Sequence, residues 1–278
     1  MFTITKIEPY KGIAGIYEEI RPSYPDQLIQ DVISITDLKP EDRLLEIGAG
    51  TGKATLQFAH KGYLIHAVEI GEEMAEILRE KCTGFPNVTI DVASFEEWTC
   101  SDGLKYNMIY SAQAFHWINK NIKYRKCYEL LKDKGYLVLF WYQPSGRKAP
   151  ERIVLDEQVD RIVKKYTSDY TPKEEQPARI AHTGVARNEY RKIEIEESGF
   201  FHIISEKEYT YAVVNSPDQY MKAMKSVPAY ASILDGLDPD IIRKMDREIE
   251  ELIIQYGGPI KEEFDYTLYI AQKSISNT

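Results

Sequence analysis

Short apolar segments alternate with amphipathic ones between residues 40 and 142 of the chain. The apolar segments predict strands at residues 43–47, 63–70, 87–92, 107–112 and 135–141. The amphipathic segments predict helices at residues 51–60, 72–82 and 121–131. Strands that alternate with helices of about ten residues predict right-handed crossovers and a parallel sheet.

Further elements are predicted on both sides of this region. Two helices, at 10–20 and 25–35, precede the first strand. After Tyr142 the pattern predicts helices at 151–166, 188–198, 216–225 and 239–256, β-rich stretches within 200–214 and a last strand at 264–271. The polar segment 167–186 predicts a loop, and Gly199 and Gly257 are expected to end the helices before them. The whole pattern predicts one α/β domain over residues 1–278, with helical additions before the first strand and in the C-terminal half.

The composition narrows the classes of function. The 278 residues carry a formal net charge of −9, which disfavours nucleic-acid binding, because Lys and Arg supply most of the affinity for phosphate. Cys82, Cys100 and Cys127 show no metal-ligand spacing, so we expect no metal site and reduced thiols in a cytoplasmic protein. We expect no signal peptide and no membrane segment, since the longest apolar run, residues 136–142, is far too short to cross a bilayer.

The stretch LLEIGAGTGKAT places three glycines between the first predicted strand and a helix. Such a loop points backbone N–H groups at a ligand. A P-loop is excluded, because Ile47 occupies the position of its first glycine and Ala54 that of its magnesium-binding hydroxyl. A dinucleotide loop fits Gly48 and Gly50 but has Lys53 where close packing requires a very small residue. Lys53 is expected to be a solvated residue of the first helical turn.

The acidic-x-Gly-x-Gly-x-Gly pattern that starts at Glu46 resembles the first motif of class I S-adenosylmethionine-dependent methyltransferases. Glu69 ends the second predicted strand 21 positions after Gly48, where a carboxylate can bind ribose hydroxyls. Phe-His-Trp at residues 115–117 and a Tyr…Arg-Pro-x-Tyr-Pro segment that ends at Pro25 resemble the small-molecule branch that includes trans-aconitate methyltransferase-like enzymes.

The resemblance implies a Rossmann-like fold with a seven-stranded, mainly parallel sheet and helices on both faces. It implies S-adenosyl-L-methionine as the cofactor, a donor-binding core at residues 36–142, and a lid and acceptor pocket within residues 143–260. The residues implied in donor binding are Tyr17, Arg21, Glu46, Gly48, Ala49, Gly50, Glu69, Ile70, Met74, Ser94, Phe95, Ser111 and Gln113. His116 is the candidate catalytic residue, as an acid, a base or a group that orients the acceptor.

The acceptor implied is a small molecule, and a carboxylate is one candidate, because it needs no base. Six basic residues after the fifth strand are candidate partners for such a carboxylate: Arg147, Arg152, Arg179, His182, Arg187 and Arg191. The alternative hypothesis is a non-catalytic or partner-regulated protein that binds S-adenosylmethionine, and an NAD-dependent oxidoreductase is a third hypothesis. Neither the acceptor, the methylated atom nor the oligomeric state follows from the sequence.

Overall fold

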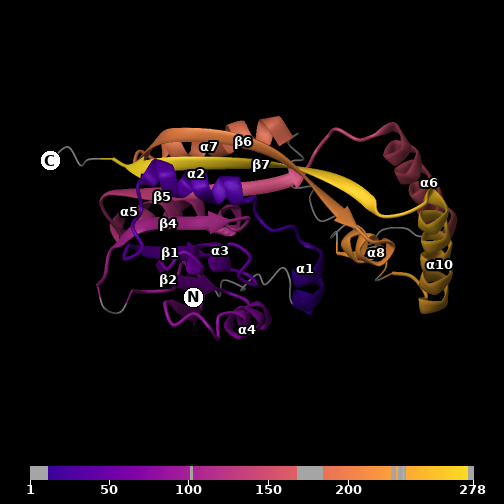
Figure 1. The fold of residues 1–278 in the computed structure, drawn as a ribbon, viewed down its shortest axis with the longest axis horizontal. Coiled ribbons are helices and arrows are strands. Elements are labelled where there is room, and N and C mark those ends of the chain that lie inside the picture. Colours follow the sequence, from indigo (N-terminus) through magenta and orange to yellow (C-terminus); the bar gives the residue numbers. More distant parts are fainter. Residues whose placement is uncertain are drawn as a thin grey trace.

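A sheet of seven strands runs through the molecule in the order β3-β2-β1-β4-β5-β7-β6 (Figure 1). The computed structural model describes residues 12–100, 103–167, 184–226, 230, 234 and 236–274. The strands are β1 (Arg43–Ile47), β2 (Leu64–Glu69), β3 (Val88–Val92), β4 (Tyr106–Ala112), β5 (Leu131–Pro144), β6 (Phe201–Asn215) and β7 (Ile260–Lys273). Among these strands β7 alone runs antiparallel to its neighbours, β5 and β6, and the other pairs are parallel. The predicted seven-stranded, mainly parallel sheet is confirmed.

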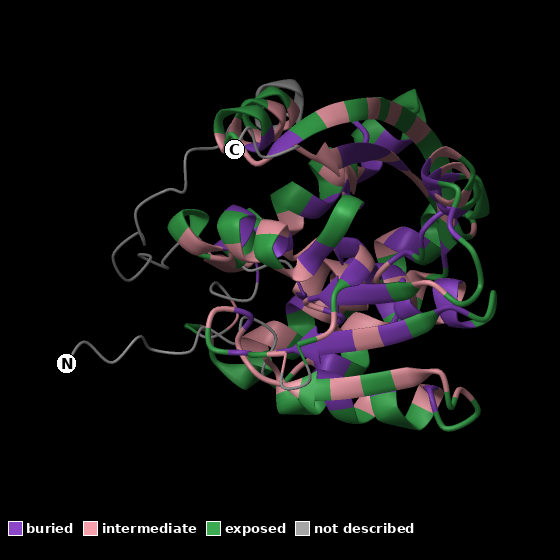
Figure 2. Cartoon of the chain, turned by 90° about the vertical axis from the view of Figure 1, so that its left-hand side faces the viewer, coloured by how far each residue is buried: buried purple, intermediate pink, exposed green. Residues whose placement is uncertain are grey.

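Helices cover both faces of this sheet. The described helices, of which α6, α8 and α10 lie in the separate lobe described below, are α1 (Ala14–Ile20), α2 (Asp26–Thr36), α3 (Thr55–Ala59), α4 (Glu72–Lys81), the 3₁₀ helix η1 (Phe115–Trp117), α5 (Lys120–Leu130), α6 (Pro150–Thr167), α7 (Gly184–Glu197), α8 (Pro217–Lys225) and α10 (Pro239–Tyr256). Successive strand residues point to opposite faces. Tyr110 of β4 therefore packs with Leu28 of α2 on one face, whereas Ile109 packs with Cys127 of α5 and Ile195 of α7 on the other. The buried residues concentrate in the strands between these helix layers (Figure 2).

A separate hydrophobic cluster holds together α6, α8 and α10, beyond the far end of the long strands β5, β6 and β7 (Figure 1). Leu155 of α6, Met221 of α8 and Ile249 of α10 are buried in it. The segment 143–260, predicted as an addition to the core, thus contributes three helices to this lobe, and also α7 and β6 to the sheet region.

Several element boundaries differ from the predicted ones. The helix predicted at 51–60 begins only at Thr55, because Gly50 and Gly52 adopt positive φ angles of 57° and 85° and keep the chain in turns. Gly199 and Gly257, with φ angles of 72° and 98°, follow the ends of α7 and α10 as predicted. The start of the helix predicted at 10–20 and most of the loop predicted at 167–186 lie outside the described residues.

The described ranges contain neither a membrane-spanning helix nor a cluster of metal ligands. No helix there combines the length and the apolar character needed to span a membrane. No three His, Cys, Asp or Glu side chains within those ranges lie close enough to hold a metal ion.

Candidate functional site

The glycine loop after β1 allows a neighbouring segment of the chain to approach its backbone closely. Gly48 has a φ angle of 70°, and its N–H donates to the carbonyl of Val68 at 2.8 Å. A Cβ atom on Gly48 would lie 2.3 Å from Cβ of Ala114, in the segment that follows β4. Gly50 also has a positive φ angle, 57°, but a Cβ there would meet no atom within 4 Å. Gly48 is thus required by packing, whereas Gly50 leaves open space in front of the loop.

Glu69, at the end of β2, accepts hydrogen bonds through both carboxylate oxygens, one from this loop and one from the start of α4. Its Oε2 accepts from the N–H of Gly50 at 2.7 Å, and its Oε1 accepts from the N–H of Gly71 at 2.8 Å. Glu69 is buried yet also lines the cavity described next, so its carboxylate can accept from hydroxyl groups of a ligand.

A cavity of about 300 Å³ opens at the carboxyl ends of the parallel strands, where ligands bind in open α/β sheets. Its walls come from Tyr17, Ile47, Gly48, Gly50, Val68, Glu69, Ile70, Met74, Ala93, Ser94, Phe95, Glu96, Glu97, Ala112, Gln113, Ala114, His116, Trp117, Ile118 and Asn119. Three of these described residues, Glu69, Glu96 and Glu97, are acidic, and none is Lys or Arg. The cavity is therefore suited to a ligand with positive charge and apolar surface.

Ten of the fourteen residues predicted for the site line this cavity. They are Tyr17, Gly48, Gly50, Glu69, Ile70, Met74, Ser94, Phe95, Gln113 and His116. The other four, Arg21, Glu46, Ala49 and Ser111, are absent from its described walls. Ala49 packs in a hydrophobic cluster with Leu78, and Ser111 donates its hydroxyl to the carbonyl of Ile47 at 2.7 Å, so both support the loop from behind. Arg21 lies with its guanidinium 5.5 Å from the ring centroid of Tyr17.

Glu46 lies in the protein interior beneath the glycine loop. Only 1% of the residue is exposed, and its Oε2 accepts from the hydroxyls of Thr55 at 2.5 Å and Tyr110 at 2.8 Å. Burial raises the pKa of the Glu46 carboxyl to about 8, and the nearby charge of Glu69 adds to this rise. At neutral pH Glu46 is therefore mainly an uncharged acid that fixes β1 to α3 and β4.

Lys53 is not the solvated residue that the sequence predicted. Its side chain is only 14% exposed, and its Nζ donates to the carbonyl of Glu18 in α1 at 2.7 Å. Lys81 of α4 pairs with the Glu18 carboxylate at 2.7 Å and donates to the carbonyl of Thr51 at 2.9 Å. Burial lowers the pKa of Lys53. These contacts fasten α1, and with it Tyr17, over the glycine loop.

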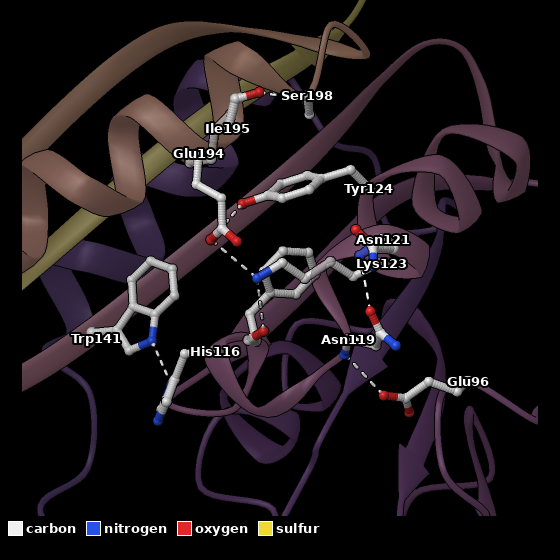
Figure 3. A network of polar contacts seen from close by, with 11 residues as sticks. Glu96, His116, Asn119, Asn121, Lys123, Tyr124, Trp141, Glu194, Ile195 and Ser198 are labelled. Atoms are coloured by element: carbon white, nitrogen blue, oxygen red, sulfur yellow. Dashed lines mark hydrogen bonds and ion pairs between the residues drawn. The ribbon is translucent and has the colours of Figure 1, made fainter. Parts of the chain in front are cut away.

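Gln113 and His116 follow β4 on the other side of the cavity. Gln113 has a φ angle of 62°, which is strained for a residue other than glycine. Its backbone N–H donates to Phe140 and its side-chain Nε2 to the carbonyl of Tyr142 at 2.7 Å, and these bonds hold the conformation. His116 lies in η1, and its Nδ1 accepts from the indole of Trp141 at 3.3 Å (Figure 3).

The basic residues proposed for an acceptor carboxylate have partners within the protein wherever they are described. Arg147 pairs with Asp265 at 2.9 Å, and Arg152 pairs with Asp156 at 2.7 Å. Arg191 lies 4.1 Å above the ring centroid of Trp141. Arg179 and His182 lie outside the described residues, as does the side chain of Arg187.

Other residues line the cavity without having been predicted for the site, including Glu96, Glu97, Trp117, Ile118 and Asn119. Most of them directly follow predicted positions, so a wider window around the motifs would have found them. Asn119 also begins α5, because its side chain accepts from the N–H of Asn121 at 3.0 Å.

Comparison with known proteins agrees with this geometry. Residues 44–135 match the family model described as a methyltransferase domain. An uncharacterized methyltransferase-like protein of Schizosaccharomyces pombe is 29% identical over 165 residues, which are 59% of this chain and 60% of that protein. Ribosomal RNA small subunit methyltransferase A of Thermotoga neapolitana is 34% identical over 90 residues, which are 30% of this chain and 35% of that protein. The chain thus spans less than two thirds of the length of either curated relative.

A solved structure extends the similarity to nearly the whole chain. That of a candidate type II methyltransferase from Anaeromyxobacter dehalogenans has a TM-score of 0.60, with 91% of this chain and 97% of that chain covered at 19% identity. This likeness confirms the predicted Rossmann-like fold. The matches support the predicted class I S-adenosylmethionine-dependent methyltransferase, but they do not distinguish the trans-aconitate methyltransferase-like branch.

Proposed function

We propose that the chain is an S-adenosylmethionine-dependent methyltransferase that acts on a small-molecule acceptor. The observation that carries this proposal is the charge of the cavity, whose described walls contain three carboxylates and neither Lys nor Arg. S-adenosylmethionine carries a sulfonium and an ammonium group, whereas NAD and ATP carry phosphates that such walls would repel. The match of residues 44–135 to a methyltransferase domain supports the same conclusion.

The residues around the cavity fit the parts of such a donor. The open space in front of Gly50 would admit its amino-acid portion, and the carboxylate of Glu69, at the cavity wall, would accept from the ribose hydroxyls. Ile70, Met74 and Phe95 would supply apolar contacts to the adenine. When bound, S-adenosylmethionine would supply a methyl group activated by the positive charge on sulfur. The chain's own contribution is then to orient the acceptor in line with that methyl group and to exclude water.

A small acceptor is favoured over a nucleic acid. One relative is named for ribosomal RNA, but this chain carries a net charge of −9, which opposes the binding of a polyanion. Carboxylates are the first acceptor class to test, because they react without loss of a proton. The cytoplasmic location predicted from the cysteines remains a prediction.

Calorimetry tests the proposal directly. We expect S-adenosylmethionine and S-adenosylhomocysteine to bind with micromolar affinity, and NAD and ATP to bind far more weakly. Tighter binding of NAD or ATP would refute the proposal. Tight donor binding without transfer to any acceptor would instead favour the non-catalytic alternative.

A further inference from the structure

One lysine of α5 binds three backbone carbonyls of the turn at residues 94–98, which follows β3 and forms part of the cavity wall. The Nζ of Lys126 donates to the carbonyl of Phe95 at 2.6 Å and to that of Glu96 at 3.2 Å. It also donates to the carbonyl of Trp98. An ammonium group has three N–H donors, so each of them can serve one of these carbonyls. The three bonds together fix the path of the turn.

The same ammonium group also supports the ring of Phe95. It lies over this ring, 4.8 Å from the centroid, within the distance at which a cation is attracted to an aromatic face. Phe95 is only 4% exposed, lines the cavity and stacks on the ring of Trp98 with 6.5 Å between the centroids. Lys126 is absent from the described walls of the cavity, so it holds both the backbone and the ring of Phe95 from behind the wall.

The charge of Lys126 offsets the acidity of this wall. Glu96 and Glu97, two of the three carboxylates at the cavity, belong to the turn that Lys126 holds. Burial lowers the pKa of Lys126, and the negative charge of the Glu96 carboxylate opposes this fall. The wall therefore has a positive charge behind it but presents only carboxylates, and no lysine, to the ligand.

A second lysine, one turn earlier on α5, holds the wall that η1 forms. Lys123, only 2% exposed, donates to the carbonyl of Phe115 at 3.4 Å and pairs with Glu194 of α7 at 3.1 Å (Figure 3). The hydroxyl of Tyr124 also donates to Glu194, at 3.3 Å (Figure 3). Lys123 thus connects η1, which carries His116, to α7.

The two walls are also joined to each other. The Oε1 of Glu96 accepts from the backbone N–H of Asn119 at 3.0 Å, where η1 leads into α5 (Figure 3). Both residues line the cavity. One helix therefore supports a continuous wall through two lysines, with Lys126 on the side of Phe95 and Lys123 on the side of His116.

We propose that Lys126 is a positioning residue for the methyl donor: it holds the turn at residues 94–98 and the ring of Phe95, and thereby sets the affinity of the cavity for the adenosine portion of S-adenosylmethionine. The inference rests on the proposed methyltransferase function, in which Phe95 contacts the adenine. Without the ammonium group, three carbonyls lose their donor and the ring of Phe95 loses the cation behind it. The turn then relaxes, and adenosine binds more weakly.

Calorimetry with S-adenosylhomocysteine and with 5′-methylthioadenosine, which lacks the amino-acid portion, tests the proposal. We expect Lys126→Met to weaken the binding of both ligands by about tenfold, the typical effect of losing a hydrogen bond to a charged group. Lys126→Arg keeps the charge and several donors, so it should weaken both less. Lys273→Met is the matched control: at the other end of α5, Lys273 donates to the carbonyl of Leu131 at 2.9 Å and lies 4.4 Å from the ring centroid of Tyr128. Its affinity should equal that of the wild type.

A double-mutant cycle separates positioning from a general loss of stability. Phe95→Leu removes the ring through which Lys126 acts, so adding Lys126→Met should then weaken the binding of S-adenosylhomocysteine by less than about threefold. In a Glu69→Gln background the full loss of about tenfold should remain, because Glu69 lies on a separate element.

Equal losses in the two backgrounds, or wild-type affinity in Lys126→Met, would overturn the proposal. Should Lys126→Met fail to fold, the same cycle with Lys126→Arg decides the question. Failure of the wild-type protein to bind either ligand would instead refute the proposed function itself.

Discussion

Glu46 is expected to make the stability of the protein fall as the pH rises, and Glu46→Gln is expected to remove this effect. The folded protein raises the pKa of this carboxyl from 4.5 to about 8. The folded state therefore retains a proton that the unfolded state loses. Stability from this group is complete below pH 4.5 and is lost progressively as the pH rises toward 8.

The size of the effect follows from the size of the shift. Each pH unit between the two pKa values lowers the free energy of unfolding by about 1.4 kcal/mol, so the whole interval corresponds to roughly 5 kcal/mol. Glutamine has nearly the same shape as the neutral acid, and its carbonyl oxygen can still accept from Thr55 and Tyr110. Glu46→Gln should therefore be the more stable protein above neutral pH.

Urea unfolding of both proteins at pH 5 and pH 8.5 measures the prediction. The wild type should lose about 4 kcal/mol more than Glu46→Gln between these conditions. Glu41→Gln, at an exposed position, serves as the control and should follow the wild type. Equal pH dependence of wild type and Glu46→Gln would refute the reasoning, since it would mean that Glu46 is ionised in the folded state.

Further predictions concern the donor site and use calorimetry with S-adenosylhomocysteine. Gly50→Val should abolish binding while the circular dichroism stays native, because the side chain fills the open space at a left-handed position; retained binding would move the site elsewhere. Glu69→Gln should weaken binding by about tenfold or more, since its amide would face an N–H of Gly50 or Gly71, and an unchanged affinity would contradict a ribose contact. Lys53→Met should weaken binding by about fivefold and speed hydrogen exchange in α1, because α1 loses a hydrogen bond of about 1 kcal/mol, whereas the exposed control Lys61→Met should change neither.

Local patterns were enough to predict the sheet and most of the cavity. The strand periodicity depends on neighbouring residues, and the spacing from Gly48 to Glu69 lies within one β-α-β segment. Both can therefore be recognised directly in the sequence. Glu69 and Gly50 are 19 positions apart, and their hydrogen bond links the two motif positions on which the prediction depended.

Contacts between distant segments could not be predicted in this way. Lys53 is buried only because α1, 35 positions earlier, docks on the glycine loop. The bond between Trp141 and His116 joins β5 to η1 across 25 positions, and periodicity assigns Trp141 to a face of the sheet without naming its partner. Glu46 was predicted at the ligand, but its side chain points to the face covered by α2 and α3, where Tyr110 meets it.

The support of His116 by α7 has an evolutionary consequence. Arg191 and Glu194 come from the segment between β5 and β6, whereas Glu69 and the glycine loop come from the first half of the chain. Under the proposed function, substitutions in α7 would therefore change the contacts that support His116 without changing those of Glu69 and the glycine loop. Exchange of α7 alone would then change the preferred acceptor but not the methyl donor. Chimaeras that replace only this helix would test that expectation.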